Sequence, residues 1–237
     1  MRTSIFTLLS LVILFTTPSC HKISGEGPTV TQTYSTGSFT SVDAGIDADL
    51  YYTQSSNYTL EISGQANVLS RITTNVVNGE LRLQFRDFVS VWHHSPITVR
   101  VSAPYLSGMG INGSGNFYAL SNVSTSTLNL KVNGSGSISV AGFTGQSLTG
   151  NISGSGAITV SGGTVSAESL QISGSGTMDM LGLNAVSAST QTSGSGKTTV
   201  NVSNSLDVRI SGSGDVYYAG NPAIYTSISG SGKVMKL

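Results

Sequence analysis

Trp92-His93-His94 is the densest cluster of functional side chains in the chain. Histidine transfers protons near neutral pH and binds metal ions. Neighbouring residues on a strand point to opposite faces, however, so two adjacent histidines make a poor metal-binding pair. We therefore interpret this segment as an exposed loop rather than a site.

A second cluster is acidic and contains Asp43, Asp47 and Asp49. Asp47 and Asp49 would share one face of a strand, where they could bind calcium or act as paired carboxylates. The same segment alternates with apolar residues from Ile46 to Leu50, as a half-buried strand with a solvated face does. We favour the solvated face.

Serine is abundant beside glycine, but its pattern fits no known catalytic or phosphate-binding motif. No Gly-Ser-Gly phrase completes the Gly-x-x-x-x-Gly-Lys-Ser/Thr pattern of a phosphate loop, and no helix is expected after any of them. They also lack the aspartate of calcium-binding nonapeptide repeats. All three histidines precede the phrases, and no serine occupies a strand-to-helix elbow. We expect a protein that is not an enzyme and has no cofactor and no metal site.

Six tyrosines leave two interpretations open. They could stack on sugars if they are exposed in a row, or they could flank a sheet with half-buried rings. These residues are Tyr51, Tyr52, Tyr105, Tyr118, Tyr217 and Tyr218.

Cys20 is the only cysteine and follows a secretory signal. Arg2 supplies the positive charge, and the apolar stretch from Ile5 to Phe15 is too short to span a bilayer. A lone cysteine at this position resembles a bacterial lipobox, although Thr17 stands where leucine is usual. We predict lipidation of Cys20; the alternative is ordinary cleavage near Ser19, which leaves a free thiol.

A five-residue phrase recurs seven times, each time as an apolar or β-branched residue, then Asn or Ser, then Gly-Ser-Gly. Successive first glycines are 21, 20, 20, 20, 18 and 18 residues apart, and a fixed period near this length indicates stacked repeats. The structural repeat glycines are Gly113, Gly115, Gly134, Gly136, Gly154, Gly156, Gly174, Gly176, Gly194, Gly196, Gly212, Gly214, Gly230 and Gly232.

Apolar residues keep step with these glycines. Pairs such as Leu170 with Ile172 and Ile158 with Val160 have even spacing, so each pair lies on one face of a strand. A flexible linker lacks such phase, and recurrent glycine excludes helix. We predict an all-β fold, a single right-handed parallel β-helix with about 20 residues per coil, because one coil buries its inward face only against its neighbours. The serines and asparagines of the phrases would stack as ladders.

The part of the chain that precedes the repeated phrases has a less regular pattern, but the pattern still indicates β-strands. Alternation from Ile46 to Tyr52 predicts a strand, and Asn78-Gly79 favours a tight turn or hairpin. We expect these to be less regular N-terminal coils of the same solenoid. The predicted division is a signal peptide (1–19), a lipid-anchor tether (20–28) and a β-solenoid domain (29–237) with regular repeats over 108–237.

Charge excludes nucleic acid as a partner. Charged residues are only 9% of the chain, where about 25% is usual. Without Arg2 the mature chain has 10 basic and 11 acidic residues, so it has no clustered positive excess for phosphates. Lys233 and Lys236 would deter edge-to-edge pairing, and we expect mainly a monomer.

The repeated Ile-Asn-Gly-Ser-Gly phrase, together with the opening pattern from Phe39 to Ile46, resembles the head GIN domain family of putative autotransporter adhesins. The resemblance covers residues 35–237 and implies a secreted or lipid-anchored β-helix of Bacteroidetes-type bacteria, shaped like pectin lyases but without their catalytic apparatus.

We expect a lipid-anchored protein of the cell envelope, at the outer membrane, that acts as a non-catalytic binding or adhesion module for an unknown carbohydrate or protein. Its membrane contact would be the lipid anchor alone. The alternatives are a structural envelope protein without a discrete ligand and, less favoured because charges are so few, an enzyme acting on polysaccharide.

Overall fold

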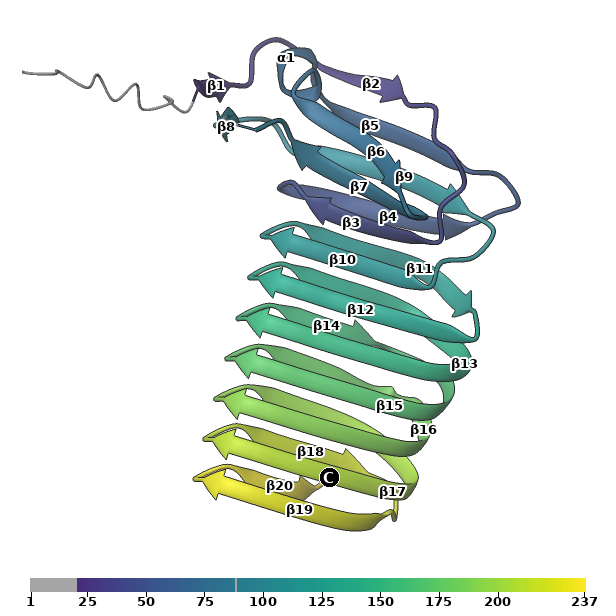
Figure 1. The fold of residues 1–237 in the computed structure, drawn as a ribbon, viewed down its shortest axis with the longest axis vertical. Helices are drawn as coiled ribbons and strands as arrows, with labels where there is room; N and C mark the ends of the chain where they lie inside the picture. Colours follow the sequence, from purple (N-terminus) through teal and green to yellow (C-terminus); the bar gives the residue numbers. More distant parts are fainter. Residues whose placement is uncertain (1–20, 88) are drawn as a thin grey trace, which may run out of the picture.

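The Gly-Ser-Gly phrases lie one above another in a stack of parallel β-coils (Figure 1). The computed structural model describes residues 21–87 and 89–237. Gly134 pairs in register with Gly113 on one side and Gly154 on the other, and the later phrases continue the same register. The predicted β-solenoid with about 20 residues per coil is therefore confirmed.

Each regular coil has one strand that ends at the first glycine of a phrase and another that begins three residues after it. Three of the strands continue around the opposite bend and are correspondingly long. The strands of the regular coils are β10 (Gly108–Gly113), β11 (Asn116–Ser124), β12 (Thr127–Gly134), β13 (Ser137–Gly154), β14 (Ala157–Val160), β15 (Gly163–Gly174), β16 (Thr177–Gly194), β17 (Lys197–Gly212), β18 (Asp215–Ala219), β19 (Ala223–Gly230) and β20 (Lys233–Lys236).

The core is a continuous column of apolar side chains between the strands. Ile152, Ile172 and Ile210 are only 2%, 1% and 3% exposed, which confirms the predicted inward face. Along each strand, the residues that alternate with these buried ones point outward to solvent, as the period of two requires. Neighbouring coils thus supply the burial that one coil alone lacks.

The two glycines of each phrase meet different steric demands. Gly154 has φ = 125°, and a Cβ there would lie 2.5 Å from the carbonyl oxygen of Gly134 in the preceding coil. Gly156 is buried, and a Cβ there would lie 2.5 Å from the carbonyl oxygen of Gly136. The first glycine is required by backbone conformation and close approach, the second by close approach alone.

Gly154→Ala is therefore expected to destabilise the fold by about 2 kcal/mol or more, because it adds a strained φ to a clash with an immobile backbone. Ser155→Ala is the matched control, since Ser155 is exposed between the two glycines. Urea unfolding followed by circular dichroism measures both. Equal stability of the two variants would contradict the steric account.

The coils before the phrases combine parallel and antiparallel pairing. Strands β3 (Ser41–Gly45) and β4 (Ala48–Gln54) lie parallel to β10 and β11, and β7 (Glu80–Phe85) and β9 (Ile97–Ala103) lie parallel to β3 and β4. These strands extend the solenoid, which agrees with less regular N-terminal coils.

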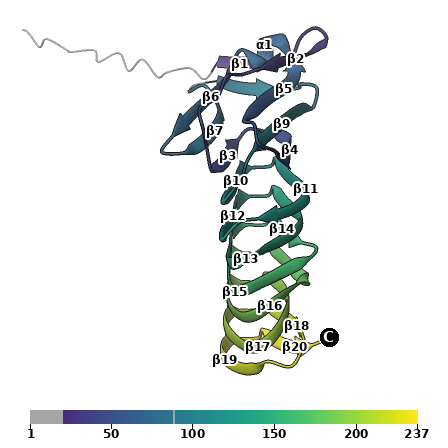
Figure 2. The same cartoon turned by 90° about the vertical axis from the view of Figure 1, so that its right-hand side faces the viewer.

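An antiparallel cap covers this end of the stack (Figure 2). Its elements are β2 (Thr29–Thr33), β5 (Thr59–Gln65), the one-turn helix α1 (Ala66–Leu69) and β6 (Ile72–Val77). Strand β5 pairs antiparallel with β2 and β9, while β6 and β7 form the hairpin that Asn78-Gly79 favours, with φ = 52° and 78° at its turn. Continuous parallel coiling therefore stops at β7 and β9.

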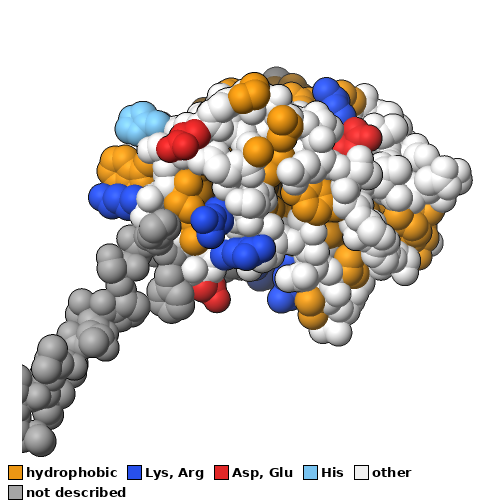
Figure 3. All heavy atoms as spheres, turned by 90° about the horizontal axis from the view of Figure 1, so that it is seen from above, with side chains coloured by type: hydrophobic (Ala, Val, Ile, Leu, Met, Phe, Trp, Pro, Cys, Tyr) orange, Lys and Arg blue, Asp and Glu red, His pale blue; other side chains and the backbone are white. Residues whose placement is uncertain are grey.

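Part of the predicted tether is held on this cap. Strand β1 (His21–Ser24) pairs in parallel with β8 (Val89–Trp92), and the Asn67 amide donates a 2.7 Å hydrogen bond to the Ser24 carbonyl. Viewed from this end, hydrophobic side chains and charged side chains of both signs are scattered over the surface (Figure 3). Within the described residues, no helix has the length and apolar character needed to cross a bilayer.

Candidate functional site

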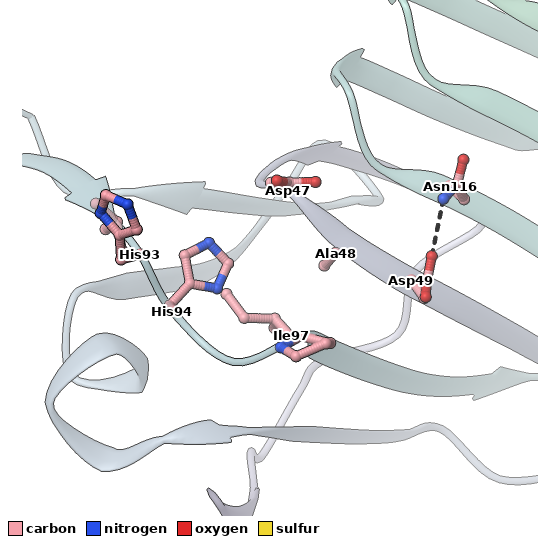
Figure 4. A pocket seen from close by; sticks show the side chains of 9 residues that line it. Asp47, Ala48, Asp49, His93, His94, Ile97 and Asn116 are labelled. Carbon is pink, nitrogen blue, oxygen red and sulfur yellow. Dashed lines mark hydrogen bonds between the residues drawn. The ribbon is translucent and has the colours of Figure 1, made fainter. Parts of the chain in front are cut away.

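A cavity of about 540 Å³ lies where the cap meets the solenoid, and we call it the junction pocket. It is open to solvent and contains both chemical clusters of the sequence, the histidines and two of the aspartates (Figure 4). Its lining residues are Asp47, Ala48, Asp49, Val91, His93, His94, Pro96, Ile97 and Asn116.

The histidines reach the pocket from the loop after β8. His93 is exposed and has φ = 38°, unusual for a residue with a side chain, and its carbonyl accepts a 3.0 Å hydrogen bond from the Gly25 backbone. The Ser95 backbone donates a 2.9 Å hydrogen bond to the buried Gln65 side chain. His94 is half-buried, and its Nδ1 lies 2.8 Å from the Ser95 carbonyl oxygen. The predicted loop is present and is fastened to the cap at both ends.

The aspartates reach the pocket from the opposite side. Asp47 lies in the bend before β4 and is exposed, and Asp49 points outward from β4, as Figure 4 shows. The Asn116 amide donates a 2.9 Å hydrogen bond to Asp49, and the Ser137 hydroxyl donates one of 2.7 Å to the Asn116 oxygen. Three successive coils are thus joined by a chain of polar side chains on their outer surface.

Asp43 belongs to a separate ladder. The Asn112 amide donates a 2.6 Å hydrogen bond to Asp43, and the Asn133 amide donates one of 2.7 Å to Asn112. This part of the predicted ladder is confirmed. Among the described residues, the phrase serines form no such bonds with one another; their backbone amides, for example that of Ser155, bond to glycine carbonyls of the preceding coil instead. Two stacked serine hydroxyls are too short to reach each other between coils, whereas an asparagine amide is long enough to reach the next coil.

Two of the six tyrosines form an aromatic pair beside the junction pocket. Tyr51 and Tyr118 occupy the next outward positions after Asp49 and Asn116, with ring centroids 5.2 Å apart and planes inclined by 20°. On the side of Tyr51 away from Tyr118, the guanidinium carbon of Arg100 lies 5.5 Å from the centroid of the Tyr51 ring. Partial burial is the main cause that raises the pKa of the Tyr118 phenol, and the nearby charges of Asp49 and ionised Tyr51 raise it further.

The other tyrosines occupy different environments. Tyr52 is buried, its hydroxyl donates a 3.2 Å hydrogen bond to the Ala103 carbonyl, and burial raises its pKa to about 12. Tyr105 is 49% exposed, and Tyr217 lies near the far end of the stack with Lys197 4.6 Å from its ring. The tyrosines therefore do not form one continuous row.

Sequence reasoning treated the histidine and aspartate clusters separately, and the structure brings them to one pocket. The parallel pairing of β4 with β9 places Ala48 beside Ile97 and so carries the preceding loop to Asp47. Within residues 21–87 and 89–237, no group of three or more His, Cys, Asp or Glu side chains is arranged to bind a metal ion. The arrangement offers hydrogen-bond donors and acceptors to a polar ligand. Cys20 lies outside the described residues.

The chain is similar to one protein family over most of its length. A family model described as "Putative auto-transporter adhesin, head GIN domain" matches residues 38–222. No curated protein matches the chain.

Several solved structures share the fold. A putative adhesin from Bacteroides fragilis NCTC 9343 is 26% identical with a TM-score of 0.86, and the match covers 91% of this chain and 100% of that one. A putative lipid binding protein from Parabacteroides distasonis ATCC 8503 is 23% identical (TM-score 0.76; 92% and 100% covered). A putative adhesin from Parabacteroides merdae ATCC 43184 is 20% identical (TM-score 0.72; 91% and 99% covered).

Proposed function

Because this chain belongs to the head GIN domain family of putative autotransporter adhesins, we propose that it is a non-catalytic adhesion module of the cell envelope. Its ligand would be bound on the outer surface of the solenoid, without covalent chemistry. The observation that carries this proposal is the outer surface at the junction, where a polar pocket continues into a hydrogen-bonded side-chain chain and an aromatic pair.

The scaffold suits such a role because its surface groups are fixed in place. Asp49, Asn116 and Ser137 stand on strands whose backbones are paired on both sides, so their spacing is set by the ladder. A ligand therefore meets donors and acceptors that lose little conformational entropy on binding.

Two other functions fit less well. One similar structure is named a putative lipid binding protein. A lipid ligand would favour an apolar cavity, whereas five of the nine residues that line the junction pocket are two aspartates, two histidines and an asparagine. A polysaccharide-cleaving enzyme would need two carboxyl groups that flank the scissile bond, whereas Asp47 and Asp49 lie on the same side of the junction pocket. A purely structural role predicts no saturable binding.

Adhesion can be tested with beads that carry residues 21–237. We expect saturable attachment to bacterial or host cell surfaces and inhibition by the free protein. Beads that carry Ile172→Asp, a variant expected to unfold, control for non-specific attachment. Absence of saturable attachment to every surface would contradict an adhesive role and favour a structural one.

We also propose that Cys20 is lipidated and anchors the protein in the envelope, since it follows an apolar signal segment and is the only thiol. Metabolic labelling with an alkynyl fatty acid is expected to mark the wild-type protein in the membrane fraction and to leave Cys20→Ser unlabelled and released. Equal labelling of both proteins would sink this idea.

A further inference from the structure

The aromatic pair leaves one ring face of Tyr118 available for a ligand. The parallel register runs Arg100, Tyr51, Tyr118 and then Ser139. Arg100 and Tyr118 cover the two faces of Tyr51, so Tyr51 has none free. On the other side of Tyr118, its partner in the next coil is the small Ser139, and Tyr118 is only half-buried. Because the large ring of Tyr118 stands beside the small side chain of Ser139, the sheet surface has a step at this point.

Hydrogen-bonding groups stand two residues away on the same face. Asn116 donates one amide proton to Asp49 and keeps a second, while Asp49 keeps its other carboxylate oxygen. The Ser137 oxygen retains lone pairs after donating its proton to Asn116. An amide, a carboxylate and a hydroxyl in fixed positions beside an open aromatic face suit a ligand with an apolar ring face and a rim of hydroxyl groups.

The charge of this surface indicates which kind of ring. Asp47 and Asp49 are the carboxylates that line the junction pocket, and the nearest Lys or Arg in the row, Arg100, lies against Tyr51 on the side away from Tyr118. A phosphate, sulfate or carboxylate group at this step would face carboxylates, and like charges placed together cost affinity. A neutral, hydroxyl-rich ligand meets no such penalty.

We propose that Tyr118, Asn116, Asp49 and Ser137 form a binding site for a neutral saccharide. The apolar face of one sugar ring packs on the free face of Tyr118 above Ser139, and its hydroxyls exchange hydrogen bonds with Asn116 and Asp49. This inference rests on the proposed adhesive function and specifies its ligand class.

The junction pocket gives the bound chain a place to continue. Asp49 and Asn116 belong both to the saccharide site and to the pocket lining, so a ring on Tyr118 adjoins the cavity. Two histidines and the exposed Asp47 line its far side and offer further donors and acceptors. The site is therefore built for an oligosaccharide rather than an isolated monosaccharide.

A glycan array that holds neutral and anionic oligosaccharides tests the ligand class with the protein of residues 21–237. Wild type is expected to bind a set of neutral glycans and to bind sialylated, sulfated or uronate-rich ones more weakly. Binding confined to anionic glycans, or to none of the saccharides, would overturn the inference.

Three variants test the site itself by titration of the best array ligand. Tyr118→Ala is expected to weaken binding by about tenfold or more, as loss of a central aromatic contact does. Tyr118→Phe keeps the ring and is expected to stay within about threefold of wild type. Tyr105→Ala removes an exposed tyrosine elsewhere and is expected to have no effect. Equal affinity of Tyr118→Ala and wild type, with both folded by circular dichroism, would place the ligand elsewhere and refute the site.

Cell attachment separates this inference from the function on which it rests. Periodate oxidation of the target surface destroys sugars and is expected to abolish bead attachment. Attachment that survives periodate but not protease treatment would refute the saccharide site and identify a protein ligand, while adhesion would stand. Absence of attachment to untreated surfaces would instead remove the adhesive function.

Discussion

Ile172→Asp is expected to prevent folding at room temperature or to leave only a small folded population. Ile172 is 1% exposed and lies in register between Ile152 and Thr192 in the core column. An aspartate there would bury a carboxylate with no charged partner, which costs several kcal/mol. Domains of this kind are stable by only about 5–15 kcal/mol, so the loss is a large part of the total.

The comparison with Ser175→Ala makes this test specific. Ser175 is exposed between Gly174 and Gly176, and the loss of its hydroxyl group is expected to lower the free energy of unfolding by about 1 kcal/mol or less. Circular dichroism and urea unfolding of the wild type and both variants measure the difference. If Ile172→Asp unfolded at the same urea concentration as the wild type, the inward face of the solenoid would be assigned wrongly.

The regular coils could be predicted because one sequence signal fixes both conformation and register. A glycine with φ near 125° is needed at the same point of every coil, so the spacing of these glycines states the coil length directly. Alternation on either side of the glycines then assigns inward and outward residues, as for Leu170 and Ile172, both of which are buried. Local and long-range information coincide in a stacked repeat.

The cap and the junction pocket could not be predicted in this way. Strands β5 and β9 pair antiparallel although about forty residues separate Leu60 from Val101, and no local pattern encodes that pairing. The approach of His94 to Asp49 depends on another pairing of distant strands, the parallel pairing of β4 with β9. The sequence did contain one usable signal: the alternation from Ile46 to Tyr52 already assigns Tyr52 to the core and Tyr51 to the surface.

Glu168 is a core residue that sequence reasoning did not identify. Its row, read along the stack, is Leu148, Glu168, Ala188 and Leu206, so a carboxyl occupies a leucine position. It is 3% exposed, and neither of its oxygens has a hydrogen-bond partner among the described residues. Burial raises the pKa of Glu168 to about 8, so at neutral pH the folded protein retains the proton.

Glu168→Leu is therefore expected to stabilise the protein, and by more as the pH rises. Because the carboxyl has its pKa at about 8 when folded and near 4.5 when unfolded, the folded state binds the extra proton between these values. The free energy of unfolding of the wild type then falls as pH increases through this range, by up to about 5 kcal/mol in total. Leucine has no proton to lose and already occupies two other positions of the same row, Leu148 and Leu206.

Urea unfolding at pH 5, 7 and 9 measures this effect. The gain from Glu168→Leu is expected to be smallest at pH 5 and largest at pH 9, because deprotonation then forces an unpaired charge into the wild-type core. Ser169→Ala, at the adjacent exposed position, is expected to track the wild type at every pH. A gain that stayed constant from pH 5 to 9 would show that Glu168 ionises alike in the folded and unfolded chain, either through solvent access or through a partner that neutralises it. In that case Glu168→Leu would stabilise the protein by apolar burial alone, and Glu168 would not make its stability depend on pH.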